Sequence, residues 1–173
     1  MAAQKRIALL VGKDFEDMEV MYPLYRLIEA GYAVDIIGED KPGTLYLGKH
    51  GYPVHSTLEI SKAKSKAYAG LVAPGGWAPD RLRRNSKVLK LVSDIDRQGG
   101  VTASICHGPW ILISAGIVKG KKMTSTPALT DDLVNAGAQW SDQEVLVDGW
   151  MVTSRKPDDL PAFMREMLKL LGA

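Results

Sequence analysis

The sequence predicts an α/β protein with a mostly parallel central sheet that is covered by helices on both faces. Short apolar runs rich in branched residues, which are typical of buried strands, recur along the 173 residues. Longer segments whose apolar residues repeat with helical spacing lie between most of these runs. Because parallel strands require a long crossover, usually a helix, this alternation favours a parallel sheet. We expect residues 1–173 to form one domain.

The first third of the chain predicts a strand, a helix and a second strand. The run RIALLVG (6–12) has the length and branched content of a buried strand, and a helix is expected over 16–31. Gly31 is a natural end for that helix, whereas Pro23 inside the pattern predicts a kink or a restart. The run AVDIIG (33–38) predicts the next strand.

The middle of the chain predicts a hairpin, a strand and a helix. Residues 41–61 are rich in turn formers, and within them 44–47 and 54–57 are candidate hairpin strands. Residues 69–76 (AGLVAPGG) are typical of a strand that ends abruptly in a Pro-Gly-Gly turn. The amphipathic pattern over 86–100 predicts a helix with a glycine end.

The last third repeats the alternation. A strand is expected over 101–105 and a helix from about 107 to 115, followed by another helix over 129–137. Residues 144–154 predict two strands across an Asp-Gly turn. A proline and an acidic first turn suit the start of a C-terminal helix over 157–172.

Composition excludes several classes of function. Apolar residues make up 46% and charged residues 24% of the chain, as in ordinary globular proteins. The net charge of +2 is too small to imply a nucleic-acid or membrane partner. The single cysteine excludes an intrachain disulfide and fits a reducing compartment. The apolar run 7–11 is too short for a signal peptide, and no run approaches the ~20 residues of a membrane span. We expect a cytoplasmic protein.

The single cysteine, Cys106, stands in a pattern that predicts a reactive thiol. SICHG (104–108) has the form small–x–nucleophile–x–small at a predicted strand-to-helix junction, which is the layout of a nucleophile elbow. Small neighbours permit the sharp turn, and the amides at the helix start favour a thiolate. The alternative is a cysteine that only packs in the core, as a small hydrophobe.

Two further loops follow predicted strands, and all three loops should meet at the carboxyl edge of the sheet. Gly75 and Gly76 let backbone N–H groups approach a substrate oxyanion, although a plain turn is the alternative for two glycines. The carboxylates of DFEDMEV (14–20) either cap a helix or include one that reaches the thiol. A carboxyl beside a thiolate would have a raised pKa and would donate a proton.

With these loops taken together, the sequence resembles the PfpI family of the ThiJ/PfpI superfamily, which includes intracellular proteases and a parkinsonism-associated protein deglycase. The segments that carry the resemblance lie in the family's order and span nearly the whole chain: DFEDMEV (14–20), GKHGY (48–52), APGGWAPDRLR (73–83), ASICHGPWILISAG (103–116), DDLVNAGA (131–138) and TSRKPDDLPAF (153–163). The resemblance implies a flavodoxin-like three-layer sandwich with a nucleophile elbow, a fold of the kind also used by class I glutamine amidotransferases.

The resemblance also implies roles for the residues of the site. Cys106 would be the nucleophile, His107 would act in acid/base chemistry, and Glu16 matches the family's protonated glutamate that hydrogen-bonds the sulfur. Gly75 and Gly76, with the amide of His107, match the groups that bind the oxyanion.

Two positions depart from other family members. In the oligomeric members a carboxylate after the Pro-Gly-Gly turn reaches an adjacent subunit and orients its histidine. Here that residue is Asp80, which is shorter than the glutamate of some members. Thr126 takes the place of a tyrosine found near the site in others. The resemblance therefore implies a homo-oligomer (dimer, trimer or hexamer) with shared active sites.

We expect an enzyme in which the Cys106 thiolate attacks a carbonyl, with small electrophilic carbonyls, as in glyoxalase- or deglycase-type chemistry, favoured over peptides as substrates. The alternative is a redox sensor or chaperone that acts through oxidation of Cys106. A glutamine amidotransferase is rejected, because that class needs a histidine after the elbow and His107 is the last in the chain. His50 and His55 do not complete a metal site with one cysteine, so we expect no metal and no cofactor.

Overall fold

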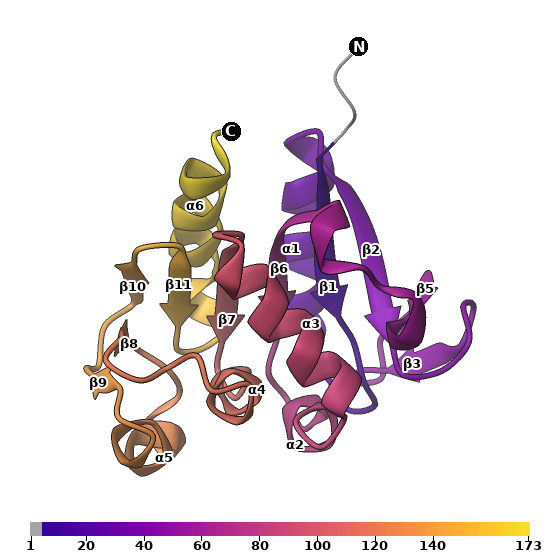
Figure 1. Ribbon diagram of the computed structural model, residues 1–173. Coiled ribbons are helices and arrows are strands. Elements are labelled where there is room, and N and C mark those ends of the chain that lie inside the picture. Colours follow the sequence, from indigo (N-terminus) through magenta and orange to yellow (C-terminus); the bar gives the residue numbers. More distant parts are fainter. Residues whose placement is uncertain (1–4) are drawn as a thin grey trace.

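The central sheet has the strand order of a flavodoxin-like fold. The structure, a computed structural model, describes residues 5–173. Its seven-stranded sheet has the order β10-β11-β7-β6-β1-β2-β5 (Figure 1). The strands are β1 (Arg6–Leu10), β2 (Ala33–Gly38), β5 (Leu58–Glu59), β6 (Tyr68–Ala73), β7 (Val101–Ile105), β10 (Val145–Asp148) and β11 (Met151–Ser154). Every pair is parallel except β10 with β11. The predicted mostly parallel α/β sheet is confirmed.

Helices cover both faces of this sheet, as the sequence predicts. They are α1 (Asp17–Glu29), α2 (Ala78–Leu82), α3 (Ser86–Arg97), α4 (Pro109–Ser114), α5 (Thr130–Asn135) and α6 (Leu160–Leu171). α3 packs on β6 and β7 from one face, with α4 beside it, while α1 and α6 pack together behind the sheet (Figure 1). Short 3₁₀ turns lie at Ile60–Lys62, Ser65–Ala67, Pro127–Leu129 and Pro157–Asp159.

Two small two-stranded sheets lie outside the central one. β3 (Leu45–Leu47) and β4 (Pro53–His55) pair antiparallel and form the predicted hairpin. β8 (Lys122–Met123) and β9 (Gln139–Trp140) pair in parallel. The sequence patterns did not indicate β5, β9 or α2, which are too short to display a periodicity of apolar residues.

The core forms around the middle strands of the large sheet. All five residues of β7 are buried, as are four of the five in β1, because helices shield both faces of these strands. α1 runs through Pro23 without the predicted restart. Proline removes only the hydrogen bond to the Glu19 carbonyl, and the helix remains fixed by its buried Val20 and Leu27.

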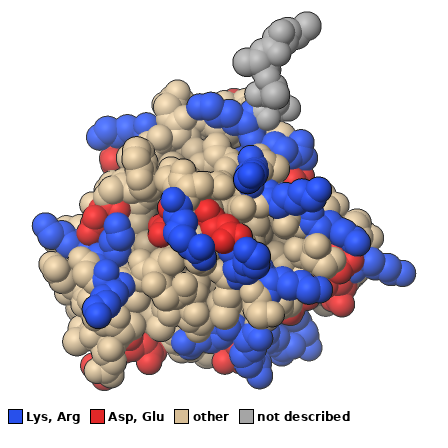
Figure 2. Space-filling model, in the orientation of Figure 1, with Lys and Arg blue, Asp and Glu red and all other residues tan. Residues whose placement is uncertain are grey.

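The surface is charged in an interspersed way. On the face over α3, acidic and basic side chains alternate (Figure 2), and Lys90 pairs with Asp94 there at 2.7 Å. No helix within residues 5–173 is both long and apolar enough to cross a membrane.

Candidate active site

The three loops expected at the carboxyl edge of the sheet do meet there. The loop after β1 bonds to the loop after β6 twice: the Glu16 amide donates to the Gly75 carbonyl at 3.2 Å, and the Trp77 amide donates to the Asp14 carbonyl at 2.8 Å. The third loop brings Cys106 to the same place, at the end of β7. This edge adjoins the β1–β6 switch point in strand order, where folds of this kind place their ligands.

Cys106 has the backbone of a nucleophile elbow. Its φ of +59° lies in the left-handed region, which costs a non-glycine residue free energy and is retained where surrounding contacts enforce it. The Cys106 amide donates to the Ser154 carbonyl at 3.1 Å, and its carbonyl accepts from the Thr126 amide at 3.3 Å. A β-carbon at Gly108 would lie 2.1 Å from the Ala73 carbonyl, so the turn requires glycine there.

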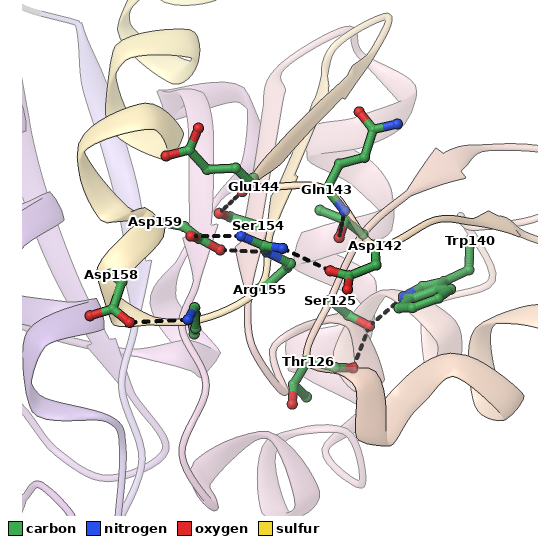
Figure 3. A network of polar contacts seen from close by, with 12 residues as sticks. Ser125, Thr126, Trp140, Asp142, Gln143, Glu144, Ser154, Arg155, Asp158 and Asp159 are labelled. Atoms are coloured by element: carbon green, nitrogen blue, oxygen red, sulfur yellow. Dashed lines mark hydrogen bonds and ion pairs between the residues drawn. The ribbon is translucent and has the colours of Figure 1, made fainter.

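The Ser154 carbonyl and the Thr126 amide, which hold the backbone of Cys106, lie in segments that are joined to others by polar contacts (Figure 3). Directly after β11, the Arg155 guanidinium donates to both carboxylate oxygens of Asp159, at 2.8 and 3.1 Å, and to Asp142 at 2.8 Å. On the other side, the indole of Trp140 donates to the Ser125 hydroxyl at 3.0 Å. These bonds therefore tie the end of β11 to the start of α6 and to the loop before β10, and they tie the segment before Thr126 to β9.

Glu19, and not Glu16, is the carboxyl group beside the thiol. Glu19 is fully buried in the first turns of α1, and its Oε2 accepts the Gly75 amide at 2.7 Å, within reach of the Cys106 sulfur. Burial, reinforced by the nearby charge of Glu16, raises the pKa of Glu19 to about 8, although the Gly75 amide opposes the shift. Glu19 thus holds its proton at neutral pH and can donate it toward sulfur or oxygen.

The predicted role of Glu16 is corrected by this geometry. Glu16 precedes the first turn of α1, and its carboxylate accepts from the Lys49 ammonium at 2.8 Å instead of the thiol. His50 Nε2 lies 3.5 Å from its other oxygen. Both glutamates belong to the same motif, but Glu16 has the extended backbone of the N-cap position, whereas Glu19 lies within the helix.

Two backbone amides face the sulfur. The amides of Gly76 and His107 lie at hydrogen-bonding positions to Cys106 and oppose the upward shift of its pKa, which burial and the Glu19 charge cause. The Gly75 amide, predicted as a third oxyanion donor, is already bound to Glu19. Gly75 instead provides space, because a β-carbon there would lie 2.7 Å from the Cys106 β-carbon.

His107 lies beside the thiol. Its Nδ1 is 3.2 Å from the Cys106 sulfur, and its ring is flanked by the indoles of Trp77 and Trp110, with centroids 5.7 and 5.1 Å away. Burial, and to a smaller extent the charge of Lys49, lowers the pKa of His107. The imidazole is therefore neutral at physiological pH and able to accept a proton.

Within the described residues, the contacts of the His107 ring are with Cys106, Trp77 and Trp110, and Asp80 is not among them. Asp80 lies exposed in α2, where its carboxylate accepts from Arg84 at 2.9 Å, one helical turn away. Thr126 reaches the elbow through its backbone amide. Lys49 is a residue of the site that sequence reasoning missed, although the GKHGY segment was among those that carried the family resemblance.

Fold and site together define an α/β protein with a cysteine on a nucleophile elbow, a protonated glutamate and a neutral histidine. The chain belongs to the DJ-1/PfpI family, which matches residues 5–170. It is 47% identical over 96% of its length to a deglycase of Pyrococcus horikoshii, of which the match covers 99%. It is 42% identical to protein/nucleic acid deglycase 2 of Escherichia coli, with 98% of this chain and 99% of that protein covered.

Solved structures agree with this assignment. A two-domain protein of Anabaena variabilis with a DJ-1/ThiJ/PfpI-like and a ferritin-like domain superposes with a TM-score of 0.95 at 35% identity. The match covers 98% of this chain and 48% of that one. The predicted family and the predicted flavodoxin-like fold are both confirmed.

Proposed function

We propose that this protein is a PfpI-type cysteine enzyme that acts on small electrophilic carbonyls, with glyoxalase- or deglycase-like chemistry in a stress-response role. The observation that carries the proposal is the Cys106 thiol on its strained elbow, with Glu19, His107 and two amides directed at it. The relatives named deglycases, at 47% and 42% identity, support the same class.

The geometry supports an isomerisation of a 2-oxoaldehyde such as methylglyoxal. The Cys106 thiolate forms an S–C bond to the aldehyde carbon, and the carbonyl electron pair moves to oxygen, where the amides of Gly76 and His107 hold it. Glu19 supplies the proton that converts this oxyanion to a hemithioacetal. His107 then removes the proton on the aldehyde carbon and returns it to the neighbouring carbon, while the hydroxyl proton of the hemithioacetal passes to the oxygen on that neighbouring carbon, which leaves a thioester. Water cleaves the thioester to lactate and regenerates the thiol, so no external oxidant or reductant is needed.

A small substrate fits this site better than an extended peptide. Cys106 is partly buried, and the rings of Trp77, His107 and Trp110 stand close together beside it. Peptide hydrolysis remains the second candidate, because it begins with the same thiol attack and the same oxyanion. Oxidation of the thiol as a sensing mechanism is the alternative that needs no substrate.

The rest of the proposal concerns the setting of the enzyme. We infer a single domain that works in the cytoplasm as a homo-oligomer, with Asp80 of one subunit near His107 of another. The exposed position of Asp80 in α2 supports this arrangement. Trp77 of the same segment is 57% exposed, and a large exposed aromatic side chain is typical of subunit contacts.

The first test compares wild-type protein with Cys106→Ser. Both are assayed for lactate formation from methylglyoxal and for cleavage of a fluorogenic peptide. We expect the serine variant to lose both activities, because a serine hydroxyl has a far higher pKa than a thiol. Circular dichroism and the melting temperature confirm that the variant is folded. A variant that retains more than a few per cent of wild-type turnover would show that Cys106 is not the nucleophile.

A further inference from the structure

We propose that Lys49, held in place by Glu16, is the cation that stabilises the anionic sulfur of Cys106. The inference rests on the proposed function only in taking Cys106 as the reactive thiol. It gives Glu16 a role distinct from that of Glu19: one carboxylate positions a cation, while the other carries a proton.

The loop that bears Lys49 is fastened to the loop after β1. The Lys49 amide donates to the Phe15 carbonyl at 2.8 Å. Both oxygens of the Asp17 carboxylate accept amides from the same loop, from His50 at 2.9 Å and from Tyr52 at 2.8 Å. A β-carbon at Gly48 would lie 2.5 Å from the Asp17 carboxyl, so this approach requires glycine. These contacts of the GKHGY segment therefore fix the backbone of Lys49 against the loop after β1.

The side chain of Lys49 is held as firmly as its backbone. Its ammonium lies 2.8 Å from Glu16 Oε2, and the Glu16 side chain is only 8% exposed, so this carboxylate has few other partners. The Glu16 amide donates to the Gly75 carbonyl, and Gly75 adjoins the β-carbon of Cys106. Lys49 itself is 42% exposed, which leaves the ammonium at the rim of the site.

The charges around the sulfur show why a cation matters there. The titratable groups that face Cys106 are Glu19, His107 and the pair of Glu16 with Lys49, and His50 lies beyond that pair. Glu19 is protonated and His107 is neutral at physiological pH. The charge of Lys49 acts on Cys106 and Glu19, each of which raises the pKa of Lys49 in turn. The amides of Gly76 and His107 oppose the rise in the pKa of Cys106, and Lys49, which is paired with Glu16, is the cation of this cluster that adds to them.

The same cluster suggests a metal site less well. Ligand atoms of Glu16, Asp17 and His50 lie within 4.8 Å of one another. However, Glu16 already forms an ion pair with the Lys49 ammonium, and both Asp17 carboxylate oxygens already accept hydrogen bonds from backbone amides. The geometry therefore favours an ion pair over a bound cation.

Alkylation of the single cysteine tests the proposal without any turnover. The rate of reaction with iodoacetamide is measured from pH 5 to 10 for wild-type protein, Lys49→Met and Lys49→Arg, with Lys87→Met as a control that removes an exposed lysine elsewhere. We expect Lys49→Met to react about three- to tenfold more slowly near pH 7, with the titration of the thiol moved to higher pH. Lys49→Arg and Lys87→Met should resemble wild type, because the first keeps the charge and the second removes a distant one.

The outcomes separate this proposal from the proposed enzyme. If Lys49→Met has the wild-type rate and titration, or if Lys49→Arg loses reactivity equally, the cationic role of Lys49 is wrong. Melting temperatures show whether each variant is folded. If alkylation responds as expected while the wild-type protein turns over neither methylglyoxal nor peptide, the enzyme proposal fails and the role of Lys49 stands.

Discussion

Glu16 and Glu19 lie three residues apart in one motif and perform different tasks. Glu19 is fully buried, binds the Gly75 amide and retains a proton, whereas Glu16 turns outward to the Lys49 ammonium. The difference follows from position: Glu16 has the extended backbone of the N-cap position, whereas Glu19 lies within the helix. A carboxyl group directed at a thiol is useful only while protonated, because two adjacent negative charges would repel.

Glu19→Gln should preserve the geometry of the protonated acid and remove its titration. In the folded chain the pKa of Glu19 is raised from 4.5 to about 8, so folding takes up a proton between these pH values. The free energy of unfolding of the parent protein should therefore fall as the pH rises from about 4.5 to 8, by up to about 1.4 kcal/mol per pH unit, and then level off. The glutamine variant should lack this slope. Urea unfolding at several pH values measures it.

The comparison is made in a Cys106→Ser background, so that no thiol titrates alongside the carboxyl. Parallel stability curves for the serine variant and the serine–glutamine double variant would contradict a raised pKa at Glu19. A Glu19→Leu variant tests the hydrogen bond separately, because leucine leaves the Gly75 amide without its partner.

For single residues, the sequence was enough to predict which site residues lie together when they are adjacent in the chain. Cys106 and His107 stand in one motif at a strand end, so their proximity follows from the sequence. The choice between Glu16 and Glu19 depends on where the helix begins, to within one residue, and a motif does not specify that. Lys49 comes from a hairpin loop whose placement over the site depends on tertiary contacts.

At the scale of elements, the strained elbow depends on contacts from β11 and from the segment before α5. Ser154 ends β11 and accepts the Cys106 amide, and Arg155 follows directly with its three hydrogen bonds to Asp142 and Asp159 (Figure 3). Asp159 is 5% exposed at the start of α6, so its carboxylate needs a cationic partner. Arg155 therefore joins the start of α6 to the backbone that holds the nucleophile.

Arg155→Met should lower kcat far more than it changes KM, because it acts on the position of the sulfur and not on substrate contacts. We expect kcat to fall about ten- to a hundredfold, together with a lower melting temperature. Arg155→Lys should recover part of the activity, since one ammonium replaces a bidentate guanidinium. Steady-state kinetics and iodoacetamide alkylation are measured for each variant.

Asp142→Asn is the milder control, because Asp142 is exposed and accepts only one of the three hydrogen bonds. A set of variants in which melting temperatures fall but kcat and the alkylation rate stay at wild-type values would show that Arg155 serves the fold alone. Equal losses in Arg155→Met and Asp142→Asn would contradict the central place of Asp159.

At the scale of the whole molecule, alternating strands and helices were enough to predict the sheet and its parallel character. The strand order adds what the pattern leaves open: β1 lies between β2 and β6, so the ends of β1, β6 and β7 come together. Short pieces such as β5 and α2 escaped prediction, because tertiary contacts and not local periodicity define them. α2 matters here, since it carries Asp80, which we propose acts in the site of a neighbouring subunit.

Asp80 should complete the site of a neighbouring subunit, so that the isolated chain is less active than the oligomer. Asp80 is exposed and pairs with Arg84 on the helix surface. Exposed ion pairs of this kind contribute at most about 1 kcal/mol, so a partner's histidine can readily take the place of Arg84. Within the described residues, the His107 ring contacts Cys106, Trp77 and Trp110, and none of these side chains is a carboxylate. A carboxylate from another subunit would fix its tautomer and support its protonated form.

Subunit complementation tests this arrangement. Cys106→Ser and Asp80→Ala proteins are unfolded together in equal amounts and refolded as mixed oligomers, with each variant refolded alone as the control. If the site is shared across a two-fold interface, random pairing gives about a quarter of the sites an intact Cys106 facing an intact Asp80. Activity on methylglyoxal should then rise toward a quarter of the wild-type value. Full activity of Asp80→Ala alone, or a mixture that gives only the mean of the two variants, would show instead that each chain carries a complete site.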